Sequence, residues 1–149
     1  MAGLMLAERG RSGAAAAAYA PTRIVWDASV LIAAFDRFDR HHERAAELLL
    51  DAAALEFLIH STTLAEVLVG PARAGRAAEM LGHLEAMGVR EYAPREGAAL
   101  RAAELCVATG LKMPDVWVLE AALSNRAGLA TFDDALARAA AEHGVPVLR

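Results

Sequence analysis

Short apolar runs alternate along the chain with longer segments of helical periodicity, and this alternation limits the fold more than any other feature. The runs that are typical of strands cover residues 24–26, 57–59, 89–93, 129–132 and 145–148. Strands that alternate with helices form βαβ units, which build parallel sheets covered by helices on both faces. The sequence therefore predicts an α/β fold in three layers, with a mostly parallel central sheet flanked by helices.

The segments between these runs carry apolar residues at spacings of three and four, as amphipathic helices do. We expect helices at residues 29–38, 41–54, 62–69, 73–87, 96–109, 114–126 and 133–143. Residues 61–63 supply hydroxyl N-caps for the third helix, and Gly70-Pro71 is expected to end it. Gly128 is expected to stop the helix that begins at residue 114.

The length and composition suit one domain. The chain has 149 residues, of which 56% are hydrophobic, which is enough for a single sizeable core. We place this domain at residues 23–149. Residues 1–22 contain a run of alanines, but charged and glycine residues at positions 8–13 interrupt the apolar segment that a signal peptide needs. They are interpreted as a flexible tail, or as the product of a start codon assigned too far upstream.

Composition also limits the location and the partners. No stretch of ~18 apolar residues is free of charge, so a membrane span is not expected. Cys106 is the only cysteine, which excludes an internal disulfide framework and a cysteine-built zinc site and fits a cytoplasmic protein. The net charge of −4 argues against nucleic-acid binding by bulk electrostatics. It does not exclude a nuclease, because bound divalent cations reverse the charge of an acidic site.

Four acidic residues stand at informative positions. Asp27 and Asp133 directly follow predicted strands, Asp115 follows Pro114 at the start of the most apolar helix, and Glu66 lies in an otherwise apolar helix. Each aspartate has an ordinary alternative, because acids at helix N-termini act as caps. For Glu66 the alternative is a helix edge facing solvent, since a buried carboxylate needs a partner, a proton or a cation.

Considered together, these acids favour a metal site. The carboxyl ends of parallel strands line one crevice of an open sheet, and ligands bind in this crevice. Several carboxylates there repel one another and cannot all stay ionised without a cation. Oxygen ligands select Mg²⁺ or Mn²⁺ over Zn²⁺, and such an ion activates water and stabilises charge on a phosphate. The pattern therefore points to phosphodiester hydrolysis.

The acids lie in four segments: IVWDAS at 24–29, LAEV at 64–67, PDVWVLEAA at 114–122 and ATFD at 130–133. In this order and spacing they resemble the PIN-domain ribonucleases, and the compact length is similar to that of VapC toxins of type II toxin–antitoxin modules. The resemblance implies a PIN-like fold and a metal-dependent endoribonuclease that cleaves cellular RNA. It also implies that Asp27, Glu66, Asp115 and Asp133 are the catalytic acids that hold one or two Mg²⁺ or Mn²⁺ ions.

Further expectations follow from the same resemblance. Ser29 and Thr131 match hydroxyl positions beside the first and last acids, where they would orient metal ligands. VapC-like proteins are homodimers, and a cognate antitoxin silences them by placing its C-terminal segment in the acidic cleft. Two features depart from the family: the long tail before Arg23, and Glu120, which falls where small residues are usual.

A basic run after the first helix is the candidate surface for RNA. The candidate contacts are Arg37, Arg40, His41, His42 and Arg44, with Lys112 near Asp115. The alternative for this run is a solvated helix face. Residues interpreted as structural are Trp26, His60, Cys106 and Trp117.

Two other enzyme and signalling classes with an acid after the first strand fit less well. A phosphatase of the haloacid dehalogenase type needs a second aspartate two residues later, where this chain has Ser29. A response-regulator receiver carries adjacent acids, whereas Ala28 follows Asp27. Two alternatives to the toxin stay open: a catalytically idle PIN-like binding or scaffold module, and a housekeeping RNA-processing nuclease.

Overall fold

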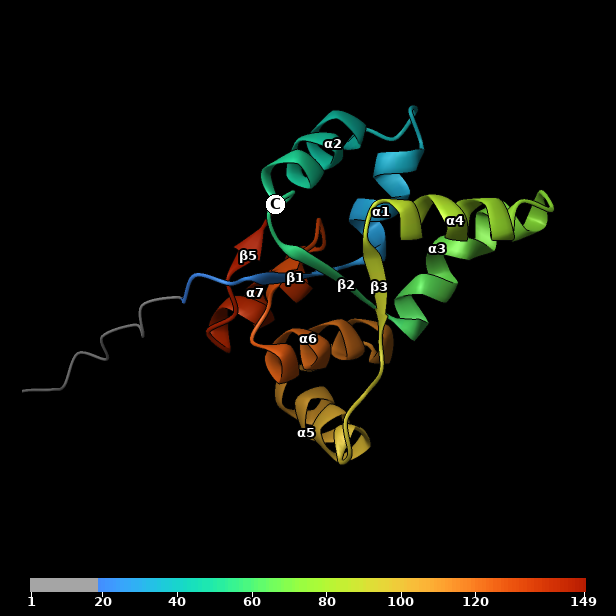
Figure 1. Ribbon diagram of the computed structural model, residues 1–149. Helices are drawn as coiled ribbons and strands as arrows, with labels where there is room; N and C mark the ends of the chain where they lie inside the picture. Colours follow the sequence, from blue (N-terminus) through green and yellow to red (C-terminus); the bar gives the residue numbers. More distant parts are fainter. Residues whose placement is uncertain (1–18) are drawn as a thin grey trace, which may run out of the picture.

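The computed structural model describes residues 19–149 (Figure 1). Most of the expected tail at residues 1–22 lies outside the described residues. The remainder of it, residues 19–22, packs on the domain, since the Tyr19 hydroxyl donates a hydrogen bond of 2.8 Å to the Ala127 carbonyl oxygen. The packed part of the chain therefore starts ahead of the expected domain boundary.

The centre of the protein is a sheet of five parallel strands. The strands are β1 (Arg23–Trp26), β2 (Glu56–His60), β3 (Val89–Tyr92), β4 (Gly128–Ala130) and β5 (Val147–Leu148). Their order across the sheet is β3-β2-β1-β4-β5. Because β1 pairs with β2 on one side and with β4 on the other, the residues that follow β1 and β4 meet at one edge of the sheet.

Helices cover both faces of this sheet. They are α1 (Ala28–Phe35), α2 (His42–Asp51), α3 (Ser61–Arg73), α4 (Ala77–Ala86), α5 (Ala98–Thr109), α6 (Met113–Asn125) and α7 (Asp134–Glu142). Helices α1 to α4 contribute to one apolar core, and α5 to α7 contribute to the other. In Figure 1, α1 and α2 lie above the strands, and α5 and α6 lie below them. The predicted three-layer α/β fold is confirmed, with a sheet that is wholly parallel.

The alternation of side chains along β1 explains the two cores. Ile24 and Trp26 point into the core beneath α1 to α4, while Val25 points into the opposite core, and all three are fully buried. Successive residues of a strand face opposite sides of a sheet, so a continuous apolar run is what a strand covered on both faces requires. Trp26 also packs edge-on against Phe57 of β2, with ring centroids 5.0 Å apart.

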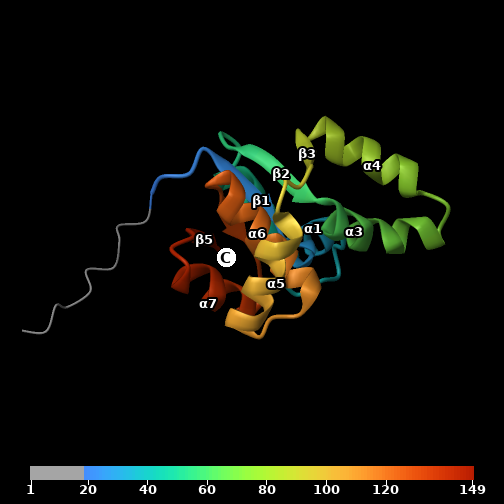
Figure 2. The same cartoon turned by 90° about the horizontal axis from the view of Figure 1, so that it is seen from below.

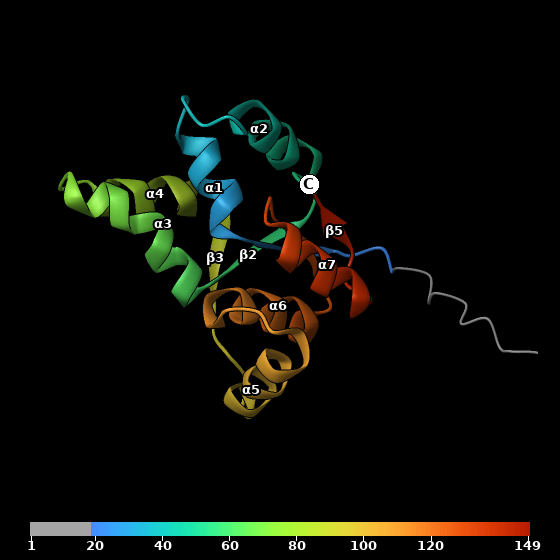
Figure 3. The ribbon, with the colours of Figure 1, turned by 180° about the vertical axis from the view of Figure 1, so that it is seen from behind.

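Two helices project from the sheet. α3 and α4 lie side by side and extend away from the strands, as Figure 1 and, from behind, Figure 3 show. On the opposite face, α5 packs against α6, which Figure 2 shows from below. Across residues 19–149, no helix combines the length and the apolar character that crossing a bilayer requires.

Two sequence predictions about α3 are wrong. The helix continues through Gly70-Pro71 and ends at Arg73. The proline lies in its last turn, so the missing N–H removes a backbone hydrogen bond only near the end of the helix. The N-cap is His60 rather than a hydroxyl residue, because the His60 Nδ1 accepts a hydrogen bond of 3.1 Å from the Thr62 backbone N–H.

The boundary between the first two helices also differs from the prediction. α1 ends at Phe35 instead of residue 38, and a turn at residues 36–41 precedes α2. The Asp36 carboxylate accepts a hydrogen bond of 3.0 Å from the Phe38 backbone N–H. Such local bonds from aspartate side chains compete with helix hydrogen bonds, which explains the early end of α1.

The end of α6 is set by a different residue than expected. Arg126 adopts the left-handed conformation that closes the helix, with φ at 50°. Gly128 lies two residues further on, inside β4. A Cβ atom at that position would lie 3.2 Å from the Ile24 side chain, so the glycine allows β1 and β4 to pack closely.

Candidate functional site

Asp27 lies at the junction of β1 and α1 and is buried, with 6% of its surface exposed. Its backbone N–H donates a hydrogen bond of 3.0 Å to the Ala130 carbonyl, which extends the β1–β4 pairing by one residue. Although Asp27 is the N-cap residue of α1, its side chain makes no capping hydrogen bond within the described chain. The capping alternative from the sequence therefore does not explain this carboxylate.

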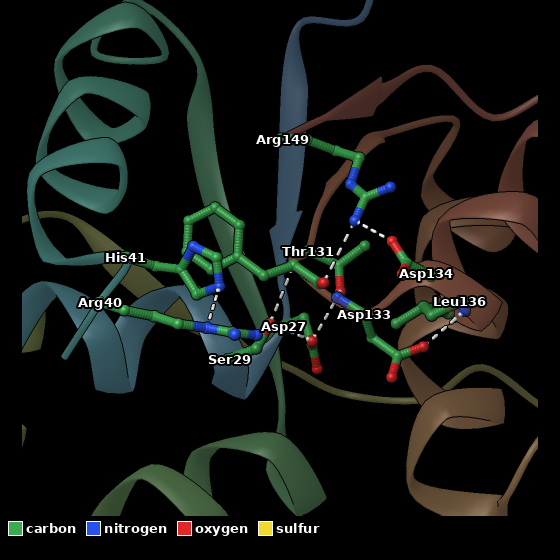
Figure 4. Close-up of polar contacts among 10 residues, drawn as sticks. Asp27, Ser29, Arg40, His41, Thr131, Asp133, Asp134, Leu136 and Arg149 are labelled. Carbon is green, nitrogen blue, oxygen red and sulfur yellow. Dashed lines mark hydrogen bonds and ion pairs between the residues drawn. The ribbon is translucent and has the colours of Figure 1, made fainter.

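Two hydroxyl groups hold the Asp27 carboxylate instead (Figure 4). Ser29 Oγ donates to Asp27 Oδ2 at 2.6 Å, and Thr131 Oγ1 donates to the same oxygen at 2.7 Å. Each hydroxyl in turn accepts a backbone N–H, from Phe132 at 3.1 Å and from Asp133 at 3.0 Å. Because a carboxylate oxygen can only accept, both hydroxyl protons point at Oδ2, and Oδ1 is left for another ligand.

Asp115 lies in the first turn of α6 and is half-buried. Burial, followed by the negative charges of Asp27, Asp133 and Glu66, raises the pKa of its carboxyl group to about 6, against the opposing charge of Lys112. The four sequence-predicted acids therefore lie close enough for their charges to act on one group. This mutual repulsion shows a surplus of negative charge.

The other two acids are more accessible. Glu66 is an exposed residue of α3, yet partial burial and then the charge of Asp27 raise the pKa of its carboxyl group. Asp133 is the N-cap of α7, where its Oδ1 accepts a hydrogen bond of 2.8 Å from the Leu136 backbone N–H. Capping therefore does account for one oxygen of Asp133, and the second oxygen remains for the site.

The donor set fits a hard divalent cation. All four acids offer carboxylate oxygens, which Mg²⁺ and Mn²⁺ prefer, and their repulsion is relieved by a cation. Within residues 19–149, however, no three acidic, histidine or cysteine side chains stand close enough to enclose one ion. The acids are thus gathered as interacting charges rather than as a closed coordination shell.

The basic residues predicted to contact RNA differ in their surroundings: Arg44 bonds Glu47 and the Arg149 carbonyl oxygen, and His42 contacts the Ala33 carbonyl oxygen. Arg37 and Arg40 are exposed on the turn at residues 36–41, and Lys112 is the residue before α6, near enough to Asp115 to affect its pKa. Arg40 bonds the His41 ring, His41 stacks on Phe132, and the Phe132 backbone N–H donates to Ser29 Oγ (Figure 4). Lys112 therefore lies near Asp115, while Arg37 and Arg40 are exposed on the turn at residues 36–41.

One charged cluster between α5 and α6 was not predicted. Glu120 of α6 is buried, with 1% of its surface exposed. Its Oε1 accepts hydrogen bonds from Arg101 Nε at 3.0 Å and from the Ser124 hydroxyl. The spacing of Glu120 and Ser124 is one helical turn, a signal the sequence does contain. The pairing with Arg101 joins two helices and could not be read from local spacing.

His60, interpreted from the sequence as structural, connects the two helices that carry Glu66 and Asp115. Its Nδ1 caps α3, and its ring stacks on Trp117 of α6 with centroids 5.0 Å apart and planes at 14°. Burial lowers the pKa of His60, despite the nearby charges of Glu120 and Glu91. The ring is therefore neutral near pH 7.

Comparisons with solved structures find similar folds in three bacterial proteins. VapBC-1 from nontypeable Haemophilus influenzae is 15% identical with a TM-score of 0.62, over 84% of this chain and 96% of that chain. VapBC2 from Rickettsia felis, bound to a DNA fragment from its promoter, is 16% identical with a TM-score of 0.60, over 84% and 96%. FitAcB from Neisseria gonorrhoeae is 20% identical with a TM-score of 0.61, over 85% and 96%.

Sequence comparisons give a family but no curated relative. No curated protein matches the chain significantly. The family model of the PIN domain matches residues 24–142, which include all four acids and both hydroxyl residues that hold Asp27. The five-stranded parallel sheet, the carboxylates at its edge and this match agree, and the chain belongs to the PIN domain family.

Proposed function

We propose that this protein is a Mg²⁺- or Mn²⁺-dependent endoribonuclease, a VapC-like toxin that cleaves cellular RNA and is neutralised by a cognate antitoxin. The observation that carries the proposal is that Asp115 lies among the other three acids: burial, followed by the charges of Asp27, Asp133 and Glu66, raises the pKa of its carboxyl group to about 6. Four carboxylates from separate elements act on one another at one sheet edge, as a cation site requires. Membership of the PIN domain family supports nuclease activity.

In the proposed site, Asp27 and Asp115 hold the principal ion, and Glu66 and Asp133 contribute directly or through water. The bound ion supplies an activated water and stabilises negative charge on the phosphate. Asp27 Oδ1 is the oxygen of the buried carboxylate that is left for this role, since both hydroxyl donors point at Oδ2.

Other side chains of this protein orient the acids and bind the substrate. Ser29 and Thr131 fix the rotation of the Asp27 carboxylate, as groups behind metal ligands do. Arg37, Arg40 and Lys112 are proposed to bind the RNA backbone, because arginine and lysine pair with phosphate oxygens. The positive charges of these three residues would attract RNA locally, although the protein as a whole has a net charge of −4.

An apolar groove next to Glu66 supports the proposed antitoxin contact. The groove has a volume of about 310 Å³ between α1, α3 and α4, and its lining includes Ile32, Phe35 and Val69. These three side chains are 39–47% exposed. An apolar segment of a partner that lies in this groove would reach Glu66, which also lines it. As for VapC-like proteins, we expect a cytoplasmic homodimer, which light scattering tests.

The test compares the wild-type protein with Asp27→Asn in the cleavage of total cellular RNA in the presence of Mn²⁺. Asp51→Asn is the matched control, because Asp51 is an exposed residue at the end of α2. Discrete cleavage by wild type and by Asp51→Asn, absent in Asp27→Asn and abolished by a chelator, supports the proposal. Equal cleavage by all three proteins would mean contamination or a wrongly assigned site. The product ends then identify the RNA and separate a toxin from a housekeeping nuclease.

Metal-dependent stability separates an enzyme from an idle scaffold module. A ligand that binds only the folded state raises the free energy of unfolding. Millimolar Mn²⁺ should therefore raise the Tm of wild type and of Asp51→Asn but not that of Asp27→Asn or Asp115→Asn. A folded wild-type protein that neither gains stability from Mn²⁺ nor cleaves RNA would favour the scaffold. A neighbouring short reading frame for a ribbon–helix–helix antitoxin would strengthen the toxin reading.

A further inference from the structure

A pocket between α5 and α6 combines an apolar wall with a buried carboxylate, that of Glu120. We propose that this pocket binds a short aliphatic amine in its ammonium form, with the ammonium group on Glu120 Oε2 and the alkyl chain along the apolar wall. The pocket has a volume of about 280 Å³, and none of the four acids of the proposed metal site lines it. The proposed amine site is therefore a second site, and it does not rest on ribonuclease activity.

The donors that reach the Glu120 carboxylate all approach one of its two oxygens. Arg101 Nε donates to Oε1 at 3.0 Å, Arg101 Nη2 lies 3.0 Å from the same oxygen, and the Ser124 hydroxyl donates to it. Arginine often pairs with a carboxylate through two parallel bonds, one to each oxygen. Here Oε2 is buried and has no hydrogen-bond partner among residues 19–149. A buried carboxylate oxygen without a donor is unfavourable, so the pocket favours a ligand that supplies one.

Arg101 is fixed on Oε1 by contacts at the start of α5. Its Nη1 donates a hydrogen bond of 2.9 Å to the Glu96 carbonyl oxygen. Gly97, the N-cap residue of α5, has a left-handed φ of 78°, and a Cβ atom there would lie 3.1 Å from Arg101 Nη1. The glycine thus allows the guanidinium to pass close to the backbone. Because Arg101 is bound to Glu96 as well as to Glu120, it leaves Oε2 to another donor.

The charge of the pocket favours a cation. Glu104 and Glu120 line it together with one basic residue, Arg101, so the lining has one negative charge in excess. A single open carboxylate oxygen suits an ammonium group, which is a compact charge with three rotatable donors. A guanidinium is a rigid fork, and it would find no second open oxygen on Glu120.

The rest of the lining is apolar. Leu105 and Ala108 of α5 and Leu123 of α6 contribute to it, between two helices that pack side by side (Figure 2). Leu105 and Leu123 also pack against the core that α5 to α7 cover. Each methylene group that leaves water for such a wall adds to the affinity of a ligand. The volume is at the small end for ligand sites, which suits a short alkyl chain.

The sequence departs from the PIN-domain pattern at the residue that supplies the open oxygen. Glu120 stands where small residues are usual. A small residue there would remove the acceptor and leave Arg101 without its carboxylate. We therefore expect amine binding in this chain and not in PIN domains with a small residue at this position.

An NMR titration of the full chain at neutral pH tests the proposal. The probes are n-butylamine, methylamine, which lacks most of the alkyl chain, and n-butanol, which lacks the charge. Glu120→Gln removes the charge of the acceptor, and Ala108→Phe fills the pocket while Glu120 stays in place. Ala103→Phe is the matched control, because Ala103 is an exposed residue of α5 that does not line the pocket. Thermal denaturation shows which variants are folded, and Ala108→Phe decides if Glu120→Gln is not.

We expect n-butylamine to shift the backbone amide resonances of Leu105, Leu123 and Ser124 to saturation. Glu120→Gln and Ala108→Phe should each weaken binding by about ten-fold or more, and Ala103→Phe should bind like wild type. Methylamine and n-butanol should each bind wild type about ten-fold more weakly than n-butylamine. Methylamine loses the buried methylene groups, and n-butanol loses the charge-assisted hydrogen bond.

The proposal is wrong if n-butylamine causes no saturable shift, or if the shifts gather around Asp27 and Asp115 instead of the pocket. It is also wrong if folded Ala108→Phe binds n-butylamine as tightly as wild type. The blocked amino acid Nα-acetyl-lysine methylamide distinguishes the source of the amine. If it binds more tightly than n-butylamine, the pocket takes a lysine side chain of a partner protein, and the free amine is excluded.

Discussion

The hydroxyl of Thr131 donates a hydrogen bond of 2.7 Å to the carboxylate of Asp27, and it accepts one of 3.0 Å from the Asp133 backbone N–H. Thr131 is fully buried and lies 104 residues from Asp27 in the sequence. One side chain thus connects Asp27, which follows β1, to Asp133, the N-cap residue of α7. The contact depends on the parallel pairing of β1 with β4.

Thr131→Val should damage both stability and activity. The valine has the same shape, but it leaves the Asp133 N–H without its acceptor and Asp27 Oδ2 with one donor fewer. Loss of buried partners of this kind costs about 1–3 kcal/mol. Groups that orient metal ligands contribute about 10- to 100-fold to activity, so cleavage should fall by that factor.

Urea denaturation and RNA cleavage measure the two effects of Thr131→Val. Thr131→Ser is the matched control, because it keeps the hydroxyl and loses only a methyl group. It should keep most of the activity. If Thr131→Val is as active and as stable as wild type, the hydroxyl does not orient Asp27.

Asp115 should make the metal-free protein less stable as the pH rises. Its pKa is about 6 in the folded protein, against an ordinary value of 3.8. The folded state therefore binds more protons than the unfolded state between these values. The stability from the protonated form is complete below pH 3.8 and is lost as the pH rises through about 6.

Asp115→Asn tests this pH dependence in a chelator. Asparagine resembles the protonated acid at every pH, so the variant should be more stable than wild type at pH ~8 by on the order of 1 kcal/mol, after solvent screening. The difference should disappear near pH ~4. Asp134→Asn is the control, because its pairing with Arg149 lowers the pKa of Asp134 and gives the opposite sign. A constant difference across pH would contradict the shared acidic cluster.

The sequence predicted the layers and the acids because these depend on local patterns. Short apolar runs such as 24–26 that alternate with helical segments suit strands covered on both faces, and an acid after such a strand lies at the carboxyl edge of a parallel sheet. Positions in the chain alone therefore placed Asp27 and Asp133 at one edge. Which hydroxyl oxygens reach which carboxylate oxygen depends on strand register, and register is a property of the folded sheet.

The turn at residues 36–41 was missed for a different reason. Phe38 continues the apolar spacing of α1, so periodicity favours a longer helix, whereas the Asp36 and Asp39 side chains bond the backbone locally and end it. Pro71 shows the reverse case, since a proline in the last turn removes little and the helix continues past it. In both places a few local hydrogen bonds, made or absent, decide between two structures that the sequence pattern leaves nearly equal.

His60 should stabilise the protein through two separable contacts. His60→Ala removes the cap of α3 and the stack on Trp117, and it should cost about 1–2 kcal/mol. His60→Asn restores a side-chain cap but not the stack, so the difference between the two variants measures the cap. Because burial lowers the pKa of His60 below 6.5, its contribution is present above pH 6.5 and is lost on acidification. Denaturation at several pH values measures the free energy of unfolding and its pH dependence. Equal stability of His60→Ala and wild type would show that neither the cap nor the stack stabilises the protein.

The ion pair between the half-exposed Arg101 and the buried Glu120 should show a strong interaction between two mutations. Arg101→Leu leaves the carboxylate of Glu120, with 1% of its side chain exposed, without its cation, and we expect a loss of about 2–4 kcal/mol. The double variant Arg101→Leu with Glu120→Leu removes both charges and should recover most of that loss, because hydrophobic replacement of a buried pair is often neutral. A denaturation double-mutant cycle measures the coupling. Additive effects of the two mutations would show that Glu120 is stabilised by Ser124 and its surroundings rather than by Arg101.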